Sequence, residues 1–125
     1  MASIEERKAT VEQYLGLVSS GTADEIMALY APDGTLEDPV GTDPKVGRDE
    51  IGAFYRSFEQ LEIQTNLREV RASGESAIAF AFDVVTKLPD ATMTVSAIEV
   101  MTFDDAGLIT SMKAYWSPEA DMVMA

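Results

Sequence analysis

The spacing of apolar residues changes once along this chain of 125 residues, and that change constrains the fold more than any other feature. Up to about residue 60, apolar residues recur every three or four positions, which is the spacing of a helix that buries one face. From about residue 61 they alternate with polar residues, as in a half-buried strand. Helices followed by strands predict an α+β fold in which the helices cover one face of the sheet.

The first helix is expected over residues 4–20. Ser3 and Glu6 form a capping box at its start, and Gly21 stands where a helix end favours a residue with positive φ. Apolar residues repeat between them at helical spacing: Ile4, Val11, Leu15 and Val18.

A short second helix is expected next, because Thr22 and Glu25 repeat the capping-box pattern. The segment Pro32-Asp33-Gly34 is expected to stop it, before a short strand from Thr35 to Asp38. The apolar face of this helix is assigned to Ala23, Ile26, Met27 and Tyr30.

A third helix and a sheet complete the expected fold. The helix follows Gly47, with Ile51, Phe54, Tyr55 and Phe58 on its apolar face. Segments rich in strand-forming residues follow it at 61–72, 76–87, 92–103 and 108–116. Short turn sequences separate these segments, so consecutive strands are expected to pair antiparallel. The chain has no internal repeat or linker, and its length predicts one domain over residues 1–125.

Two amino acids are missing, and their absence narrows the chemistry. The chain has no cysteine, which excludes disulfides, thiolate metal sites and a cysteine nucleophile. It has no histidine, which excludes Ser-His-Asp triads, histidine–metal centres and the commonest general base. Any acid–base chemistry must therefore use carboxylates, tyrosine or lysine.

The chain is strongly acidic, with 9 Lys and Arg against 22 Asp and Glu and a formal net charge of −13. Nucleic acids and anionic membranes recruit basic patches, so neither is an expected partner. The acidic segment 33–49 lacks the spacing of a calcium loop, and no metal is expected. The first residues lack the features of a secretory signal and no apolar run is long enough to span a membrane, so a cytoplasmic location is expected.

Glu99 lies in the most informative segment, residues 92–103. The odd-numbered positions of this segment are apolar apart from Glu99, which predicts that its carboxyl points into the hydrophobic side of the sheet. Loss of hydration there raises the pKa and favours a protonated carboxyl that donates a hydrogen bond. The alternatives are a bulge that turns Glu99 to solvent, or an arginine partner that keeps it ionised.

Tyrosines and one aspartate are the other candidates. Tyr14, Tyr30 and Tyr55 fall on apolar helix faces, and a buried phenol needs a hydrogen-bond partner. Each is either an ordinary core residue bonded to a backbone carbonyl, or part of a hydrogen-bonded network beside Glu99. Asp38 precedes a proline and is either a turn residue or a carboxylate at the rim of an apolar cavity, placed to shuttle a proton.

Together these residues resemble bacterial ketosteroid isomerases, which belong to a cone-fold superfamily with nuclear-transport-factor-like and SnoaL-like proteins. The likeness rests on Tyr14 in the first helix, the block Gly-Thr-Leu-Glu-Asp-Pro-Val-Gly at 34–41, and Glu99 after Ala97-Ile98. It covers almost the whole chain and is strongest over 10–55 and 76–84. It implies a curved antiparallel sheet around a deep apolar cavity, closed by three helices, in a homodimer without a cofactor.

The resemblance also implies an activity. The family converts β,γ-unsaturated 3-ketosteroids to the conjugated α,β-isomers by moving a proton from C4 to C6. Asp38 is implied as the general base, with Tyr14 and a protonated Glu99 donating hydrogen bonds to the C3 oxygen; a neutral carboxylic acid in this role is the family's own chemistry. The implied steroid-binding residues are Tyr30 and Tyr55 behind Tyr14, and a wall of Phe54, Phe82, Val84, Met112 and Trp116.

The chain departs from the best-known members of that family at one position. Those members carry aspartate where this chain has Glu99, and the additional methylene changes the reach of the donor. Two other functions stay open: a related cone-fold enzyme, such as a polyketide cyclase or dehydratase, that uses Asp38 on another apolar ketone, and a non-catalytic binder of an apolar ligand. Tyr14 together with Glu99 favours stabilisation of a dienolate.

Overall fold

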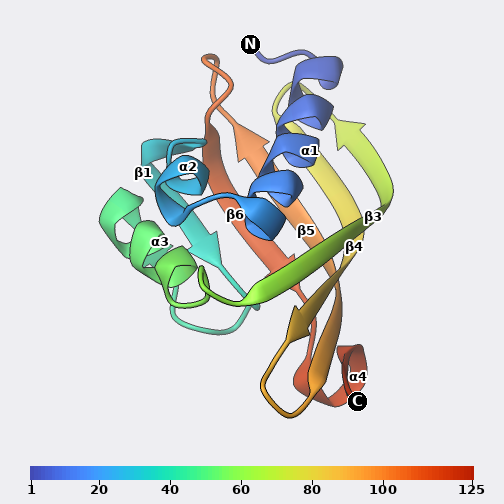
Figure 1. Cartoon of the computed structure of the whole chain (residues 1–125). Helices are drawn as coiled ribbons and strands as arrows, with labels where there is room; N and C mark the ends of the chain where they lie inside the picture. The colour runs from blue at the N-terminus through green and yellow to red at the C-terminus, as the bar shows by residue number, and fades with distance from the viewer.

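The first helix, α1, runs from Ile4 to Ser20 in the computed structural model, which describes all residues 1–125 (Figure 1). Its predicted capping box is confirmed: Glu6 N–H donates to Ser3 Oγ at 3.1 Å, and Ser3 N–H donates to Glu6 Oε1 at 3.0 Å. The helix buries Val11, Tyr14 and Leu15 against the inner face of the sheet.

Gly21 ends α1 in a different way from the one predicted. Its φ is −104°, so the expectation of a positive φ was wrong. Close approach favours glycine here instead, because a Cβ atom would lie 2.6 Å from Cδ2 of Leu17 and 3.0 Å from the Leu17 carbonyl oxygen.

Helix α2 (Ala23–Met27) has the predicted Thr22–Glu25 capping box but is shorter than predicted. Tyr30 does not belong to it; this residue begins strand β1 (Tyr30–Glu37) and pairs with Ile109. A tyrosine suits either element, and the periodicity could not show that its backbone pairs with a distant strand. The strand predicted from Thr35 is therefore the second half of a longer strand.

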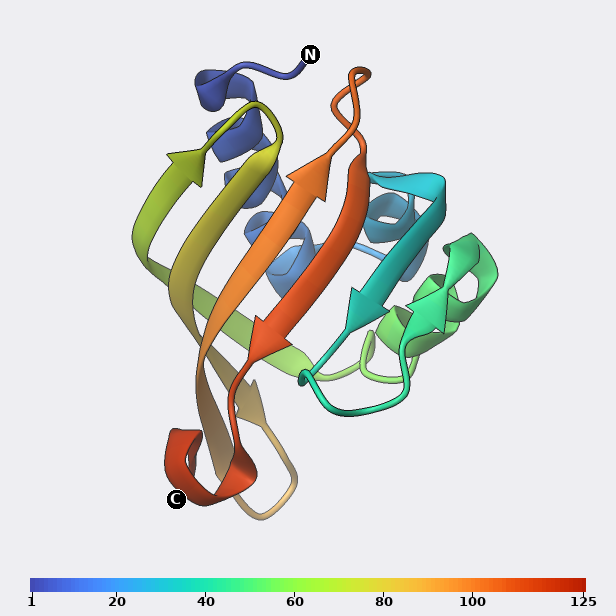
Figure 2. The same ribbon diagram turned by 180° about the vertical axis from the view of Figure 1, so that it is seen from behind.

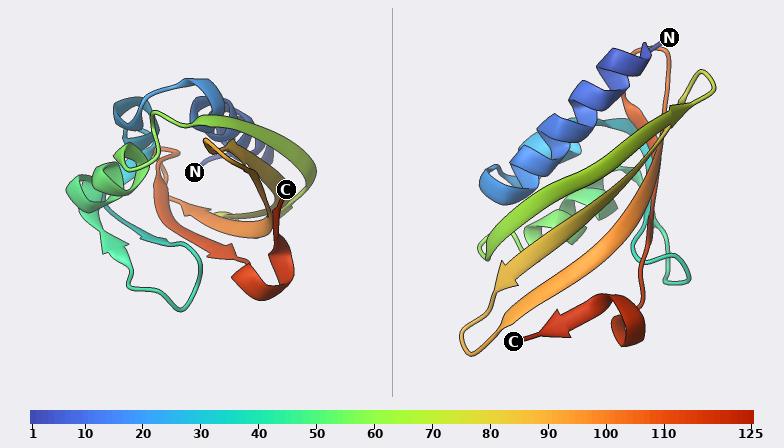
Figure 3. Two further views of the ribbon diagram at one scale, coloured as in Figure 1. Left: turned by 60° about the horizontal axis from the view of Figure 1, so that its bottom comes forward. Right: turned by 90° about the vertical axis from the view of Figure 1, so that its right-hand side faces the viewer.

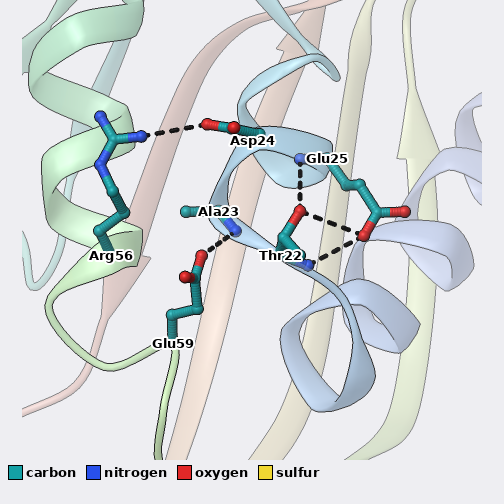
Figure 4. Close-up of polar contacts among 6 residues, drawn as sticks. All are labelled: Thr22, Ala23, Asp24, Glu25, Arg56 and Glu59. Carbon is teal, nitrogen blue, oxygen red and sulfur yellow. Dashed lines mark hydrogen bonds and ion pairs between the residues drawn. The ribbon is translucent and has the colours of Figure 1, made fainter.

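Helix α3 (Gly47–Arg56) confirms the third predicted helix, although Phe58 lies beyond its end. Figure 4 shows how its end is tied to α2: Arg56 pairs with Asp24 at 3.1 Å, and the Glu59 carboxylate accepts the backbone N–H of Ala23 at 2.5 Å. These contacts fix the segment that carries the aromatic residues of the third helix beside the sheet.

The long strands lie within one residue of the predicted segments. They are β3 (Glu62–Ser73), β4 (Ala77–Lys87), β5 (Thr92–Phe103) and β6 (Ile109–Tyr115). They pair antiparallel in sequence order, as predicted, and the whole sheet follows the order β2-β1-β6-β5-β4-β3, with β2 at Lys45–Val46. The sheet curves around α1, α2 and α3, which lie on its inner side, and no long helix covers its outer face (Figures 2 and 3). The predicted cone-shaped α+β fold is thus confirmed.

Strand β1 pairs parallel with β6, a contact that the sequence did not predict. Glu37 lies opposite Lys113, and just beyond it the N–H of Val40 donates to the Ala114 carbonyl at 2.8 Å. This pairing brings the end of β1, and with it Asp38, beside the end of β6.

The C-terminal residues form two short elements. These are the short helix α4 (Pro118–Asp121) and strand β7 (Met122–Met124). Strand β7 pairs with residues 93–95 of β5, where β6 has already ended. None of the helices is both long and apolar enough to cross a membrane.

Candidate active site

A cavity of about 280 Å³ lies between the inner face of the sheet and helices α1 and α3. This volume is near the lower end of the range for small-molecule sites. Of the 17 residues that line it, 14 are hydrophobic, so a ligand must be largely apolar. The eight predicted residues in the wall are Tyr14, Asp38, Phe54, Tyr55, Phe82, Val84, Glu99 and Trp116.

Glu99 points inward from β5, between Phe80 and Ala114 of the neighbouring strands. The residue is 2% exposed, no bulge turns it outward, and no arginine pairs with it. Its Oε1 atom is buried and has no hydrogen-bond partner in the protein. Burial first, and the charge of Asp38 second, raise the pKa of this carboxyl well above its ordinary value of 4.5. Burial therefore favours the neutral form of the carboxyl, which has a proton to donate.

The three buried tyrosines form a hydrogen-bonded chain. The Tyr30 and Tyr55 hydroxyls are 2.7 Å apart, and the Tyr55 and Tyr14 hydroxyls are 3.0 Å apart. Burial raises the pKa of each phenol well above 10, so all three stay protonated. When Tyr30 donates to Tyr55 and Tyr55 donates to Tyr14, the proton of Tyr14 is left for a ligand. The predicted hydrogen-bonded network of tyrosines is therefore confirmed. The alternative, in which each hydroxyl bonds to a backbone carbonyl, is not what the structure shows.

Asp38 faces the cavity from the end of β1 and is half-buried. Its Oδ1 atom accepts a hydrogen bond of 2.8 Å from Nε1 of Trp116, at the end of β6. Burial raises the pKa of the Asp38 carboxyl above 3.8, and the indole N–H partly offsets this by stabilising the anion. Asp38 thus differs from Glu99 in having both solvent contact and a donor, which favour its ionised form.

Two predicted steroid-binding residues lie outside the cavity wall. Tyr30 is fully buried behind Tyr55 and reaches the site only through the hydroxyl chain. Met112 is also fully buried, opposite Met101 in β5 and Leu36 in β1. It packs in the core, and Ala114, two residues further along the same strand face, lines the cavity instead.

Sequence reasoning missed part of the wall. The missed residues are Val18, Phe58, Leu61, Ile63, Thr86, Met93, Val95, Ala97 and Ala114. Alternation in strands β4 and β5 carried a signal for some of them, since Val95 and Ala97 share the strand face of Glu99. No group of three acidic side chains is arranged to hold a metal ion.

Fold and site define a class: a cone-shaped α+β protein whose apolar cavity holds one fully buried and one half-buried carboxyl beside a phenol. The family model for the SnoaL-like domain matches residues 11–112, and the chain belongs to this family. The predicted resemblance to ketosteroid isomerases is also confirmed. A steroid Δ-isomerase of Nocardioides simplex is 49% identical over 119 residues, which cover 95% of each chain.

Three other similar proteins are not named as steroid isomerases. The epoxide hydrolase LasB of Streptomyces lasalocidi is 28% identical over 88% of this chain, which matches 41% of that protein's length. The structure of SalBIII, an epoxide hydrolase/cyclase-like enzyme of salinomycin pyran-ring formation, superposes with a TM-score of 0.92 at 25% identity over both full chains. RV0760c of Mycobacterium tuberculosis shares the fold, with a TM-score of 0.90 at 21% identity over both full chains.

Proposed function

We propose that this protein is a steroid Δ-isomerase, which converts β,γ-unsaturated 3-ketosteroids to their conjugated isomers. The observation that supports this most is the buried, unpartnered Oε1 atom of Glu99, in one apolar cavity with Tyr14 and Asp38. A buried polar atom without a partner is costly, and a ligand oxygen would satisfy it. The 49% identity to a steroid Δ-isomerase supports the same function.

In the proposed reaction, Asp38 is the general base. Its carboxylate takes the proton from C4 of the steroid, and the electron pair moves through the carbonyl to give a dienolate with its negative charge on the C3 oxygen. Asp38 then returns the proton to C6, and the double bond becomes conjugated with the carbonyl. The proton that leaves the steroid is the one that returns, so the reaction needs no redox partner.

Tyr14 and Glu99 are the proposed donors to the C3 oxygen. Both are protonated because burial raises their pKa values, and both line an apolar cavity where little water competes. Donors held in place stabilise developing negative charge without reorganising during the reaction. The Tyr30–Tyr55 pair holds the Tyr14 hydroxyl from behind.

The direct test is to add a β,γ-unsaturated 3-ketosteroid and follow the ultraviolet absorbance of the conjugated enone. In Asp38→Asn we expect turnover to fall by roughly two to four orders of magnitude, the usual contribution of a general base. Steroid binding, followed by the fluorescence of Trp116, the single tryptophan, should persist. Failure of the wild type to raise the absorbance would contradict the function, and full activity in Asp38→Asn would contradict the base.

A second candidate has specific support from the likeness to SalBIII and LasB. A neutral acid and an ionised base are also what epoxide opening requires, because the acid protonates the epoxide oxygen while the base activates the attacking hydroxyl. Turnover of the two substrates distinguishes the two functions. The second candidate is supported if the protein converts a hydroxy-epoxide but not the ketosteroid, and if this activity depends on Asp38.

We also infer that the protein is a homodimer, as the resemblance implies. Ile98 and Tyr115 are 51% and 48% exposed and lie opposite one another in β5 and β6. Neighbouring apolar side chains on an uncovered sheet face are typical of an interaction surface. A second copy of this chain is the proposed occupant.

A further inference from the structure

Residues 57–61, which connect α3 to β3, form part of the rim of the cavity. Phe58 and Leu61 of this segment line the cavity wall. Leu61 is 39% exposed, and every other residue of the wall is less exposed. A residue that meets both solvent and the cavity lies where the cavity opens. Residues 57–61 are called the rim segment below.

The backbone of the rim segment is bonded only locally. The N–H groups of Phe58 and Glu59 donate to carbonyls in the last turn of α3, both at 3.4 Å. These bonds are longer than the roughly 2.7–3.2 Å of most N–H···O hydrogen bonds. The N–H of Leu61 donates to the carbonyl of Phe58 within the segment itself. Such bonds shape a turn without attaching it to another element, so a side chain has to fix the position of the rim segment.

Glu59 supplies that attachment. Its Oε2 atom accepts the backbone N–H of Ala23, at the start of α2, across 36 positions of the chain (Figure 4). Ala23 is 1% exposed, and the first N–H groups of a helix have no acceptor within the helix. Without the carboxylate this buried donor would be left unpaired, which is costly. The need to pair it holds Glu59, and the rim segment with it, against α2.

Helix α2 is a firm anchor for this bond. Gly52 of α3 packs so closely on α2 that a Cβ atom there would lie 2.8 Å from Sδ of Met27. Arg56 and Asp24 add an ion pair of 3.1 Å between the same two helices. Ile26 of α2 is buried in the core. A bond from the rim segment to α2 therefore fixes the rim relative to the cavity as a whole.

We infer that Glu59 is a positioning residue that keeps Phe58 and Leu61 against a bound ligand and so sets how long the ligand stays in the cavity. The ligand is the apolar steroid of the proposed function, on which this role rests. Without the bond to α2, the rim segment has to be ordered each time a ligand binds, and that cost weakens binding. The chemical step is spared, because the proposed base and the two proposed donors lie outside α2, α3 and the rim segment.

The test measures ligand release and chemistry separately in Glu59→Ala. Trp116 fluorescence in stopped flow follows the binding and release of a conjugated 3-ketosteroid. The single-turnover rate is measured with a saturating β,γ-unsaturated 3-ketosteroid. We expect the dissociation rate constant and the Kd to rise roughly three- to tenfold, as for loss of one hydrogen bond. The single-turnover rate should stay at the wild-type value.

Two further variants separate the hydrogen bond from the charge. Glu59→Gln should bind and release the steroid as the wild type does, because its amide oxygen can accept the same N–H. The matched control is Glu62→Ala, which removes a carboxylate one residue beyond Leu61, where it pairs with Lys87 and is exposed. This control should leave both binding constants unchanged.

The inference is overturned if Glu59→Ala matches the wild type, if Glu62→Ala changes as much as Glu59→Ala, or if Glu59→Gln is as weak as Glu59→Ala. A fall in the single-turnover rate without faster release also overturns it. The proposed function is judged by the wild type alone. If steroid release depends on Glu59 but no ketosteroid is isomerised, the isomerase function fails and the role of Glu59 stands.

Discussion

At the scale of single residues, the site depends on how much water each carboxyl loses. Glu99 has lost nearly all of it and has no donor, whereas Asp38 is half-buried and accepts from an indole. The sequence could predict the first of these environments, because the alternation of β5 is regular around position 99. It could not predict the second, because Trp116 reaches Asp38 across 78 positions of the chain.

The indole contact gives a pH prediction for Trp116→Phe. As general base, Asp38 must be ionised, so kcat/KM falls as the pH drops through its pKa. The Trp116 N–H lowers that pKa, and its removal leaves the upward effect of burial unopposed. The acid limb of the kcat/KM profile should therefore move to higher pH. The control is Phe82→Leu, which alters the cavity wall but not the hydrogen bond to Asp38, and it should leave the acid limb at the same pH. If the acid limb does not move in Trp116→Phe, the indole N–H does not control the pKa of Asp38.

Glu99 also makes stability depend on pH, with a sign opposite to that of most carboxyls. The folded state keeps its proton above 4.5, the ordinary pKa, whereas the unfolded state releases it. Stability from this group is complete below pH 4.5 and is lost as the pH rises toward the folded-state pKa, at about 1.4 kcal/mol per pH unit.

Glu99→Gln keeps the shape and removes this titration. The free energy of unfolding of the variant, measured with urea and compared with that of the wild type at each pH, should gain about 1.4 kcal/mol per pH unit above pH 4.5. The gain should stop once the pH exceeds the folded-state pKa. Contributions from the other carboxyls cancel in the difference. Parallel curves for the two proteins would show that Glu99 is ionised in the folded state.

At the scale of elements, periodicity predicted the long elements but not the extent of the short helix α2. Helix α1 and the four long strands were placed almost to the residue, because caps, turns and alternation all agree there. The parallel pairing of β1 with β6 was not predictable from local pattern, and it is what assigns Tyr30 to a strand and brings Asp38 to Trp116. The prediction that Met112 lines the cavity was wrong for a related reason. Whether an inward side chain packs in the core or lines the cavity depends on its position along the cone, which local pattern does not show.

Arg7 joins two elements and gives a stability prediction. It is 2% exposed, and its guanidinium donates to the carbonyls of Ala77 at 2.6 Å and Gly74 at 3.1 Å, at the β3–β4 turn. Arg7→Met should lower the free energy of unfolding by about 2 kcal/mol, because charge-assisted bonds to these carbonyls are lost. Arg71→Met is the control: its pair with Glu69 is exposed, and the expected change is within about 0.5 kcal/mol. Equal losses in the two variants would contradict a special role for Arg7.

At the scale of the whole molecule, the curved sheet has two faces with different uses. The inner face builds the cavity from one chain alone, and helices α1 and α3 close it. The outer face carries the exposed side chains of Ile98 and Tyr115, and Asp121 of the short helix α4 lines a pocket together with them. The net charge of −13 opposes association of two copies, so an apolar contact on this face has to outweigh that repulsion.

The homodimer prediction follows from this arrangement. Sedimentation velocity should give twice the 13.6 kDa of one chain, and added salt should strengthen the association by screening the repulsion. The double change Ile98→Lys and Tyr115→Lys should yield monomers, because it adds two charges to the contact. Val123→Lys, at an exposed apolar residue of β7, should leave the dimer intact. Since every cavity residue comes from one chain, the monomeric variant should still bind steroid; a wild type that stays monomeric at all concentrations would contradict the outer face as the interface.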